Sequence, residues 1–368
     1  MKVCHFCSSN VDSIYFSYLG KGLTEKGVKQ FFVTLNVVET PKWMGDFSSA
    51  QYLSLGIPSR TLYPLAVIRL ANFLKKNKID ILHTHLFDAA VIGLIAANLA
   101  KTKVKIVSRH HLDEVSLLGT RLHVALDKWT NSKSDCVIVP SDATRRFMLE
   151  KERQRNTNIR VIPYGFDFNA LSATESDRRK VREEFGFGND FVIGCVGRFF
   201  KNKGHSYLLT ALKDVIKEFP NVKLFLLGSG DRKYIEDLIN ELNLKDFVVF
   251  AGYRKDVPAC MKAMDLLVHP SLSESFGQVI VEAMSVETPV IVTSVGGVPE
   301  IVENEETGLV IQPKNSDAIR DSILEMIRDS ELRNRLAKAG KKSVYKKYHV
   351  ENFIDRHWKC YQELLDKK

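Results

Sequence analysis

Cysteine is scarce in this chain, with six residues among 368. A disulfide-stapled scaffold would concentrate many more in a much shorter chain, so this scatter is typical of reduced thiols in a cytoplasm. Cys4 and Cys7 form one C-x-x-C, but the sequence offers no second ligand pair at zinc spacing and no helix-opening context that would depress a thiol pKa. We therefore expect both to be core residues of a first strand.

Long apolar runs are also missing. Stretches such as AAVIGLIAANLA at 89–100 fall short of the roughly 20 residues that a membrane-spanning helix needs. The start, MKVCHFCSSNVDS, has one lysine but no apolar segment of signal-peptide length. We expect a cytoplasmic protein without a transmembrane segment.

Three further absences exclude function classes. No G-x-G-x-x-G follows the first apolar run, which argues against a dinucleotide-dependent oxidoreductase. The chain has a net charge of +9, yet it shows no nucleic-acid-binding module and no interleaving of aromatic and basic residues. Acidic metal clusters of the D-x-D kind are absent, because fragments such as FDF at 166–168 are isolated. We therefore expect no nucleic-acid partner and no metal site.

What is present is a repeated alternation of short apolar runs with amphipathic stretches, which predicts strand–helix units around parallel sheets, an α/β fold. The predicted strands form two sets of five: 2–6, 29–35, 81–85, 105–109 and 136–141, then 191–197, 223–228, 248–252, 266–271 and 289–294. A chain of this length fits two domains. The passage 160–180 contains Pro163 and Gly165 before a charged run, and it predicts a linker with the boundary near residue 166. The last predicted helix, 350–368, could pack back on the first domain.

Two doubly wound, Rossmann-like domains would turn the carboxyl ends of their strands toward a central cleft. GRFFKNKGH at 197–205 follows a predicted strand, so Arg198 and Lys203 would lie there with a helix starting near Gly204. A guanidinium, an ammonium and a positive helix end together make an anion site. The alternative is a pair of solvated loop cations.

The stretch ESFGQVIVEAMS at 274–285 places two glutamates around a Phe-Gly pair. Gly277 permits a close backbone approach, and a helix follows that carries Glu282 about a turn and a half beyond the amides near 276–278. The two carboxylates would hold separate hydroxyl-bearing parts of one elongated ligand with a phosphate between them, which describes a nucleotide sugar. The alternative makes Glu274 a helix-dipole partner and Glu282 a solvent-facing residue.

In order along the second half, GRFFKNKG, LLGSGDR, VVFAGYRKDVP, VHPSLSESFGQVIVEAM, PVIVTSVGGVPEIV and TGLVI resemble the retaining glycosyltransferases of family 4 (GT4, group 1), which have the GT-B fold. The first half matches more loosely, in ILHTH, KIVSRHH, VPSDATRRFML and VIPYGFD. The resemblance implies that residues 1–165 bind the acceptor and 166–349 the nucleotide sugar. It implies a metal-independent hexosyltransferase without a cofactor that uses a UDP or GDP sugar and retains the anomeric configuration.

The resemblance also implies roles on the donor side. Arg198 and Lys203 would bind the pyrophosphate, Glu282 the ribose, and Glu274 the transferred sugar. The amides of Phe276 and Gly277 would support the sugar or phosphate. The backbone of three residues would edge the base: Gly252, Tyr253 and Arg254.

On the acceptor side, His110 matches the family's histidine near the reacting carbon, and His111 is its rival because the register is open by one residue. The implied catalytic set is thus His110, Glu274, Arg198 and Lys203. Where the family often has glycines after its first strand, this chain has three polar residues: Ser8, Ser9 and Asn10. His83 and His85 end a predicted strand, where they would either touch substrate or make strand-end hydrogen bonds.

The basic charge is uneven, because residues 60–155 hold 17 Lys and Arg against 9 Asp and Glu. Its clusters are KKNK at 75–78, KTKVK at 101–105 and RRFMLEKERQR at 145–155, where we expect Phe147 and Met148 to be exposed. An anionic membrane attracts such patches by about 1 kcal/mol per basic residue. We therefore expect an enzyme that docks on the inner face of a membrane and glycosylates a lipid-linked or surface-polysaccharide precursor. The alternatives are a small soluble acceptor, or a nucleotide-sugar epimerase on the same fold.

Overall fold

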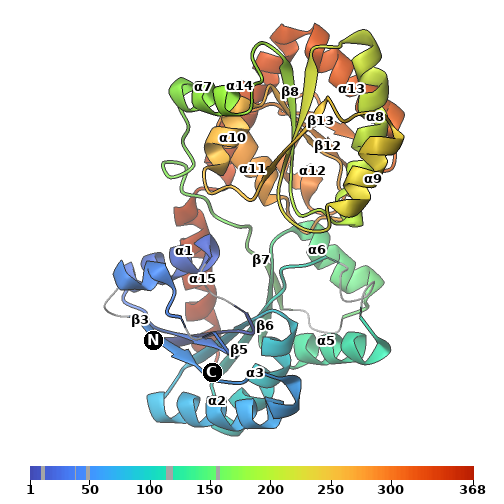
Figure 1. Ribbon diagram of the computed structural model, residues 1–368. Coiled ribbons are helices and arrows are strands. Elements are labelled where there is room, and N and C mark those ends of the chain that lie inside the picture. The colour runs from blue at the N-terminus through green and yellow to red at the C-terminus, as the bar shows by residue number, and fades with distance from the viewer. Residues whose placement is uncertain (10–12, 38, 47–49, 113–118, 155–157) are drawn as a thin grey trace. The chain divides into compact units, whose positions relative to one another are not determined.

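The computed structural model describes the chain except for residues 10–12, 38, 47–49, 113–118 and 155–157. It divides into two compact α/β units, each built on one parallel sheet (Figure 1). Unit 1 comprises Met1–Gly165 with Val350–Lys368, and unit 2 comprises Phe166–His349.

Unit 1 has a seven-stranded sheet in the order β3-β2-β1-β4-β5-β6-β7. Its strands are β1 (Lys2–Cys7), β2 (Lys29–Thr34), β3 (Ala50–Ser54), β4 (Ile81–His85), β5 (Val104–Ser108), β6 (Cys136–Val139) and β7 (Ile159–Val161). Its helices are α1 (Ile14–Glu25), α2 (Tyr63–Asn77), α3 (Phe87–Ala100), α5 (Arg121–Lys133), α6 (Asp142–Arg146) and α15 (Val350–Leu365), with short turns η1 (Lys42–Asp46), η2 (Arg60–Leu62) and η3 (Phe147–Lys151).

The two faces of this sheet are covered by different helices, because side chains alternate along a strand. On β1, Cys4 and Phe6 pack toward α2 and α3, whereas Val3 packs toward α1 and α15. Helix α15 therefore belongs to the core of unit 1 although it is the last element of the chain, as its red ribbon among the blue elements shows (Figure 1). Its apolar stripe is buried at Phe353 and Tyr361.

Unit 2 has a six-stranded sheet in the order β10-β9-β8-β11-β12-β13. Its strands are β8 (Phe191–Val196), β9 (Val222–Leu227), β10 (Val248–Gly252), β11 (Leu266–His269), β12 (Val290–Thr293) and β13 (Leu309–Ile311). Its helices are α7 (Glu175–Glu184), α8 (His205–Glu218), α9 (Lys233–Glu241), α10 (Val257–Ala263), α11 (Gln278–Ser285), α12 (Val298–Ile301), α13 (Ser316–Arg328) and α14 (Ser330–Lys347), with the turn η4 (Lys201–Lys203). Helices α8, α9 and α13 share the main core with the sheet.

All ten predicted strands occur, and three more were not predicted: β3, β7 and β13. Each of these is the outermost strand of its sheet, and two of them have only three residues. The passage 160–180 was expected to be a linker, but it begins inside β7 and ends inside α7. Cys4 and Cys7 lie buried in β1 as predicted, and burial raises the pKa of both thiols.

The expectation of an exposed apolar patch at 147–148 is wrong for Met148, which is fully buried against Val137 and Val139 of unit 1. The chain continues from α6 into the single π-helical turn η3, and this turns Met148 toward the sheet. Arg145 and Arg146 both pair with Asp142, so part of their charge is neutralised locally. Among the helices in the described ranges, none is both long and apolar enough to cross a bilayer.

Candidate functional site

The loop after β8 positions Lys203 in unit 2. Lys203 ends the turn η4, and Gly204 follows with a φ of 70°, a left-handed conformation that suits glycine, before α8 begins. A Cβ on Gly204 would lie 1.9 Å from the carbonyl oxygen of Pro270, so any side chain there would push the loop away from the end of β11. The amide of Leu272 also donates to the Asn202 carbonyl at 2.8 Å. The loops after β8 and β11 are therefore held together.

This contact brings Lys203 to Glu274. The Nζ atom of Lys203 lies 2.7 Å from Glu274 Oε2, and Nε2 of His269, the last residue of β11, lies 3.2 Å from the same oxygen. Burial works to raise the pKa of Glu274, but hydrogen bonding and charge from His269 and Lys203 outweigh it and lower the pKa to about 2. Glu274 is thus an ionised carboxylate that joins two basic side chains.

Arg198, by contrast, is exposed, and its side chain does not contact Glu274. Its guanidinium lies over the ring of Phe200, 4.7 Å from the centroid, and no carboxylate of the described residues lies within ion-pair distance. The adjoining loops are tightly packed, because a Cβ on Gly228 would lie 1.9 Å from the Gly197 carbonyl oxygen. An unpaired guanidinium on a fixed loop can bind an anion in two-pronged fashion.

Helix α11 carries Glu282, as predicted from the sequence. Gly277 caps this helix with a φ of 111°, and Phe276 is buried just before it. Burial raises the pKa of Glu282 to about 7, and no Lys, Arg or His in the described part of the chain pairs with its carboxylate. A sparsely solvated carboxylate without a cation gains from accepting hydrogen bonds from hydroxyl groups.

The segment after β10 contains an exposed aromatic side chain, Tyr253, and an arginine, Arg254, that forms ion pairs within unit 2. Gly252 adopts a φ of 69°, and Tyr253 is 79% exposed. Arg254 forms ion pairs with Glu184 at 2.6 Å and Asp256 at 2.7 Å. Its guanidinium is therefore engaged, which leaves Tyr253 and the backbone to meet a ligand.

In unit 1, the polar loop after β1 is described only as far as Ser9. Ser8 is partly buried, and Ser9 is exposed with its Oγ 3.7 Å from Cys7 Sγ. Asn10, the third predicted residue of this loop, lies outside the described residues.

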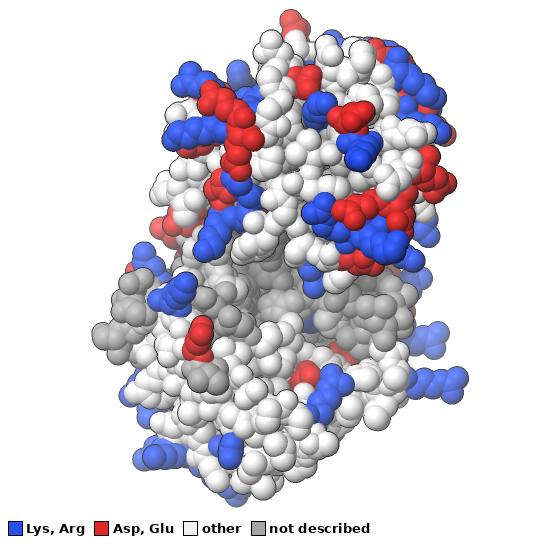
Figure 2. Space-filling view, in the orientation of Figure 1, with Lys and Arg blue, Asp and Glu red and all other residues white. Residues whose placement is uncertain are grey.

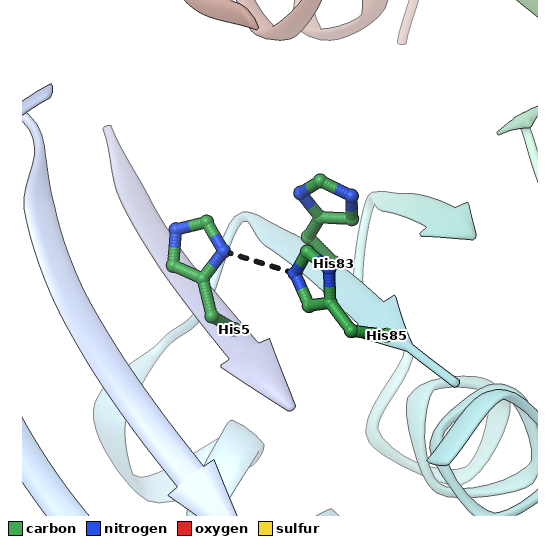
Figure 3. A group of neighbouring side chains, drawn as sticks. All are labelled: His5, His83 and His85. Atoms are coloured by element: carbon green, nitrogen blue, oxygen red, sulfur yellow. Dashed lines mark hydrogen bonds between the residues drawn. The ribbon is translucent and has the colours of Figure 1, made fainter. Parts of the chain in front are cut away.

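His83 and His85 lie in the interior of unit 1, between the sheet and α15. Ser108 and Tyr361 hydroxyls lie 2.7 and 2.6 Å from the two ring nitrogens of His83. Nε2 of His85 lies 3.4 Å from Nδ1 of His5, which the sequence did not single out (Figure 3). These contacts favour strand-end hydrogen bonding over substrate contact.

His110 and His111 differ in their surroundings. His110 Nδ1 lies 2.7 Å from the Tyr164 hydroxyl, and its Nε2 lies 3.4 Å from His85 Nδ1. Burial lowers the pKa of His110 to about 4, so the ring is neutral at physiological pH. Nδ1 of His111 is buried without a hydrogen-bond partner among the described residues, and burial, with nearby Arg109, lowers its pKa to about 3.

Arg109 is a supporting residue that sequence reasoning missed. Its buried guanidinium makes two bonds to Glu152, at 2.6 and 2.7 Å, and a third to Asp127 at 3.3 Å. It also donates to the carbonyls of His111 and Leu112. The chain around His110 is therefore anchored by a buried ion cluster. Nothing in the sequence indicated this role, because an arginine that follows a strand can be either buried or exposed.

His5, His83 and His85 have ring nitrogens within 4.8 Å of one another, which in principle could hold a metal ion. Both nitrogens of His83 already have hydroxyl partners, however. A metal would have to displace one of them.

Comparisons with known proteins identify both units as parts of a glycosyltransferase. The family model for glycosyl transferases group 1 matches residues 177–343, and the model for glycosyltransferase family 4 matches residues 13–170. An uncharacterised glycosyltransferase of Methanocaldococcus jannaschii is 32% identical over 75% of this chain and 73% of its own.

Other relatives have named activities. N-acetyl-alpha-D-glucosaminyl L-malate synthase of Bacillus anthracis is 26% identical over 94% of this chain and 92% of its own. A UDP-Gal:alpha-D-GlcNAc-diphosphoundecaprenol alpha-1,3-galactosyltransferase of Escherichia coli is 26% identical over 82% and 80%. The crystal structure of Anabaena HepE with UDP-glucose superposes with a TM-score of 0.87 at 23% identity, covering 99% of this chain and all of that one.

The two parallel-sheet units are thus those of the GT-B fold. The relatives span both units rather than one of them. The chain belongs to the group 1, family 4 glycosyltransferases and is a transferase enzyme.

Proposed function

We propose that this enzyme transfers a hexose from a nucleoside-diphosphate sugar to a hydroxyl acceptor with retention of the anomeric configuration. The observation that carries the proposal is the arrangement in unit 2. Lys203 and His269 meet Glu274 at the carboxyl ends of β8 and β11, and α11 presents Glu282 without a cationic partner in the described ranges. In doubly wound sheets, ligands bind at such strand ends.

The donor assignment gains support from the HepE structures, which were solved in complex with UDP and with UDP-glucose. We propose a UDP or GDP sugar for this chain. Glu282 would accept hydrogen bonds from the ribose and Glu274 from the transferred sugar. The segment Gly252–Arg254 would edge the base, with Tyr253 as the exposed ring nearest to it.

The chemistry requires stabilisation of the departing nucleoside diphosphate. Negative charge develops on the phosphate as the glycosidic bond breaks, and positive groups fixed in advance lower that barrier most. We propose that Arg198 and Lys203, with the amino ends of α8 and α11, supply this charge in place of a divalent ion. Phe276 and Gly277 would contribute their amides at the start of α11.

Unit 1 would hold the acceptor. We propose His110 rather than His111 as the histidine near the reacting carbon, because its ring is held between Tyr164 and His85. Ser8 and Ser9 would lie on the acceptor side. The E. coli relative's name specifies a lipid-linked acceptor, and the B. anthracis relative's name specifies L-malate. We favour a lipid-linked or surface-polysaccharide precursor, reached by a cytoplasmic enzyme docked on a membrane.

The first test is incubation with a panel of UDP and GDP sugars, without acceptor, to detect slow release of the nucleoside diphosphate. One donor should be hydrolysed, equally with and without EDTA, and Lys203→Ala should slow this hydrolysis about 100-fold. Hydrolysis that EDTA stops and metal restores would contradict the metal-independent mechanism. Conversion of the sugar to an epimer without net hydrolysis would favour the epimerase alternative.

A further inference from the structure

Glu274 is held by side chains through only one of its two carboxylate oxygens. Lys203 Nζ lies 2.7 Å from Oε2, and His269 Nε2 lies 3.2 Å from the same atom. Neither contact involves Oε1, and no other side chain of the described residues donates to it. The backbone of Glu274 is fixed separately, because its carbonyl accepts from the amide of Gly297 at 3.1 Å. The protein therefore binds one oxygen of this carboxylate and leaves the other for a ligand.

The two donors to Oε2 differ in how firmly they are held. Lys203 lies on the turn η4, and its ammonium ends a flexible four-carbon stem that is 20% exposed. His269 is the last residue of β11, and its side chain is only 4% exposed. Its backbone pairs with Val292 of β12, and its carbonyl accepts from Thr293 Oγ1 at 3.3 Å. A ligand can therefore draw Lys203 away from Glu274, whereas His269 stays in place.

The direction of the bond from His269 follows from the state of its partner. Glu274 is ionised in its ion pair with Lys203, and an ionised carboxylate only accepts, so Nε2 of His269 carries the hydrogen. Burial raises the pKa of Glu274, and the hydrogen bond from His269 is the largest influence that lowers it, ahead of the charge of Lys203. His269 therefore continues to favour the ionised carboxylate after Lys203 has moved.

We propose that His269 is a positioning residue that holds Glu274 by Oε2 while the donor phosphate draws Lys203 away, so that Oε1 stays in place for a hydroxyl of the transferred sugar. The inference rests on the proposed function, which assigns the phosphate to Lys203 and the sugar to Glu274. Without His269, the departure of Lys203 would leave the carboxylate with no side-chain donor from the described residues. Glu274 would then regain its rotamer freedom when the reaction needs it fixed.

The role predicts that a defect at His269 appears only when the donor is bound. In the free enzyme Lys203 holds Glu274 at 2.7 Å, so the carboxylate keeps a partner in a His269 variant. A nucleoside diphosphate lacks the sugar and does not contact Glu274 under the proposed function. Its affinity should therefore be unchanged, whereas turnover of the nucleotide sugar should fall.

The test is a double-mutant cycle on the full-length enzyme. Turnover is measured at saturating concentration of the UDP or GDP sugar that the wild type uses, and binding of UDP and GDP is measured by calorimetry. His269→Leu should lower kcat about tenfold or more, with nucleoside-diphosphate affinity unchanged. In the Glu274→Ala background it should cause no further loss, because residues that act through one contact are not additive. His269→Gln, whose amide supplies an N–H donor, should recover most of kcat.

Thr288→Val is the matched control for loss of a buried polar group. The Thr288 hydroxyl donates to the Met261 carbonyl at 2.8 Å, and the residue precedes β12, at the opposite end of that strand from Thr293. This variant should lose stability in urea unfolding and keep the kcat of the wild type. If His269→Leu folds poorly, His269→Phe takes its place, because a phenyl ring fills the space of the imidazole without an N–H donor.

The outcomes separate this inference from the proposed function. A loss of kcat in His269→Leu that is equally large in the Glu274→Ala background would show that His269 acts elsewhere. Full kcat in His269→Leu, or a His269→Gln as impaired as His269→Leu, would also overturn the proposal. In each of these cases the wild type is active, so only the inference fails. If the wild type turns over none of the donors, the proposed function fails and the inference falls with it.

Discussion

At the scale of single residues, the ion pair between Lys203 and Glu274 is an interaction of the free enzyme that donor binding would weaken. Both side chains are largely buried and 2.7 Å apart, so each neutralises the other. A phosphate near Lys203 and a sugar hydroxyl near Glu274 would each weaken this pair. Under the proposed function, donor binding therefore replaces an internal ion pair by two contacts to the ligand.

We expect Lys203→Ala and Arg198→Ala each to lower turnover about 100-fold, because each removes a preorganised positive group from the departing phosphate. Lys203→Arg should also be impaired, since a planar guanidinium does not replace a compact ammonium beside Glu274. Steady-state kinetics with saturating donor measures these losses. Lys201→Ala, on the same turn, is the control; full activity in both primary variants would move the phosphate site elsewhere.

Substitutions of Glu282 and Glu274 should have different kinetic effects, the first on donor binding and the second on turnover. Glu282→Ala should raise the donor KM about tenfold and change kcat little, because a ribose contact is similar before and during bond cleavage. Glu274→Ala should chiefly lower kcat, by about 100-fold, since a contact to the reacting sugar strengthens as charge develops. Kinetics together with calorimetric titration of the nucleoside diphosphate would check both, and wild-type values in both variants would refute the assignment.

Glu282 should also make stability depend on pH. Burial raises its pKa from 4.5 to about 7. Between these values the native state holds a proton that the unfolded state has lost, so stability falls as the pH rises through this window. Glu282→Gln should therefore be more stable than the wild type by up to about 3 kcal/mol above pH 7, with the gain vanishing near pH 4.5.

Urea unfolding at several pH values measures this difference. Glu287→Gln, which removes an exposed carboxylate just after α11, is the matched control. A gain of constant size at every pH would show that the pKa of Glu282 is the same in the native and unfolded states. Glu274 has the opposite sign: its pKa is lowered to about 2, so its contribution is present above 4.5 and is lost as the pH falls toward 2.

At the scale of elements, the joint between the loop after β8 and the end of β11 depends on one glycine. Gly204→Ala combines a left-handed φ of 70° with an overlap on the Pro270 carbonyl, and we expect it to destabilise unit 2 by about 3 kcal/mol. Gly186→Ala has a similar φ of 65° but open space around the added Cβ, and should cost only about 1 kcal/mol. Urea unfolding measures both, and equal losses would show that the contact with Pro270 is unimportant.

The same elements show how far sequence reasoning reaches. Central strands such as β4 and β12 were predicted because strands buried on both faces form continuous apolar runs. The edge strands β3 and β7 escape this signal, since β3 alternates partly buried with exposed residues and β7 is only partly buried along its three residues. Helix α11 was found because a glycine and an apolar stripe mark its start and its inner face.

The site divides in the same way. Lys203 and Glu274 were singled out by their motifs, but their direct contact was not expected, because it depends on how two loops fold against each other. His269 lay within a quoted motif and was not assigned a role. Gln30 gave no signal at all, since a glutamine in a strand is ordinarily a surface residue. Its burial, with bonds from its amide nitrogen to Gly20 and Thr24, is seen only in the structure.

At the scale of the whole molecule, the distribution of charge differs between the units. On the face that Figure 2 shows, Asp and Glu lie beside Lys and Arg over much of unit 2, whereas unit 1 has a broad uncharged area with mostly Lys and Arg, and a few acidic residues, around it. Helices α2 and α3 pack on the same face of the unit 1 sheet. They expose Ile68 and Leu99, 54% and 53% accessible, on helices that end near the basic segments 75–78 and 101–105.

These helices suit a membrane surface better than the segment around Met148, which is buried. Exposed apolar side chains insert at the lipid boundary, while nearby lysines are attracted to anionic head groups within a Debye length. We therefore expect the protein to float with liposomes that contain anionic lipid, and the bound fraction to fall with added salt. Ile68→Ser with Lys75→Gln and Lys76→Gln should reduce binding more than neutralising Arg145, Arg146, Lys151 and Arg153.

The matched control removes two charges from unit 2, at Lys338 and Lys342, which are exposed on α14. This variant should float like the wild type, because neither lysine belongs to the basic segments beside Ile68 and Leu99. Equal losses in all three variants would mean that net charge alone drives binding and that no face is preferred. No flotation at low salt would leave a soluble acceptor, such as the malate named for the B. anthracis relative, as the better account.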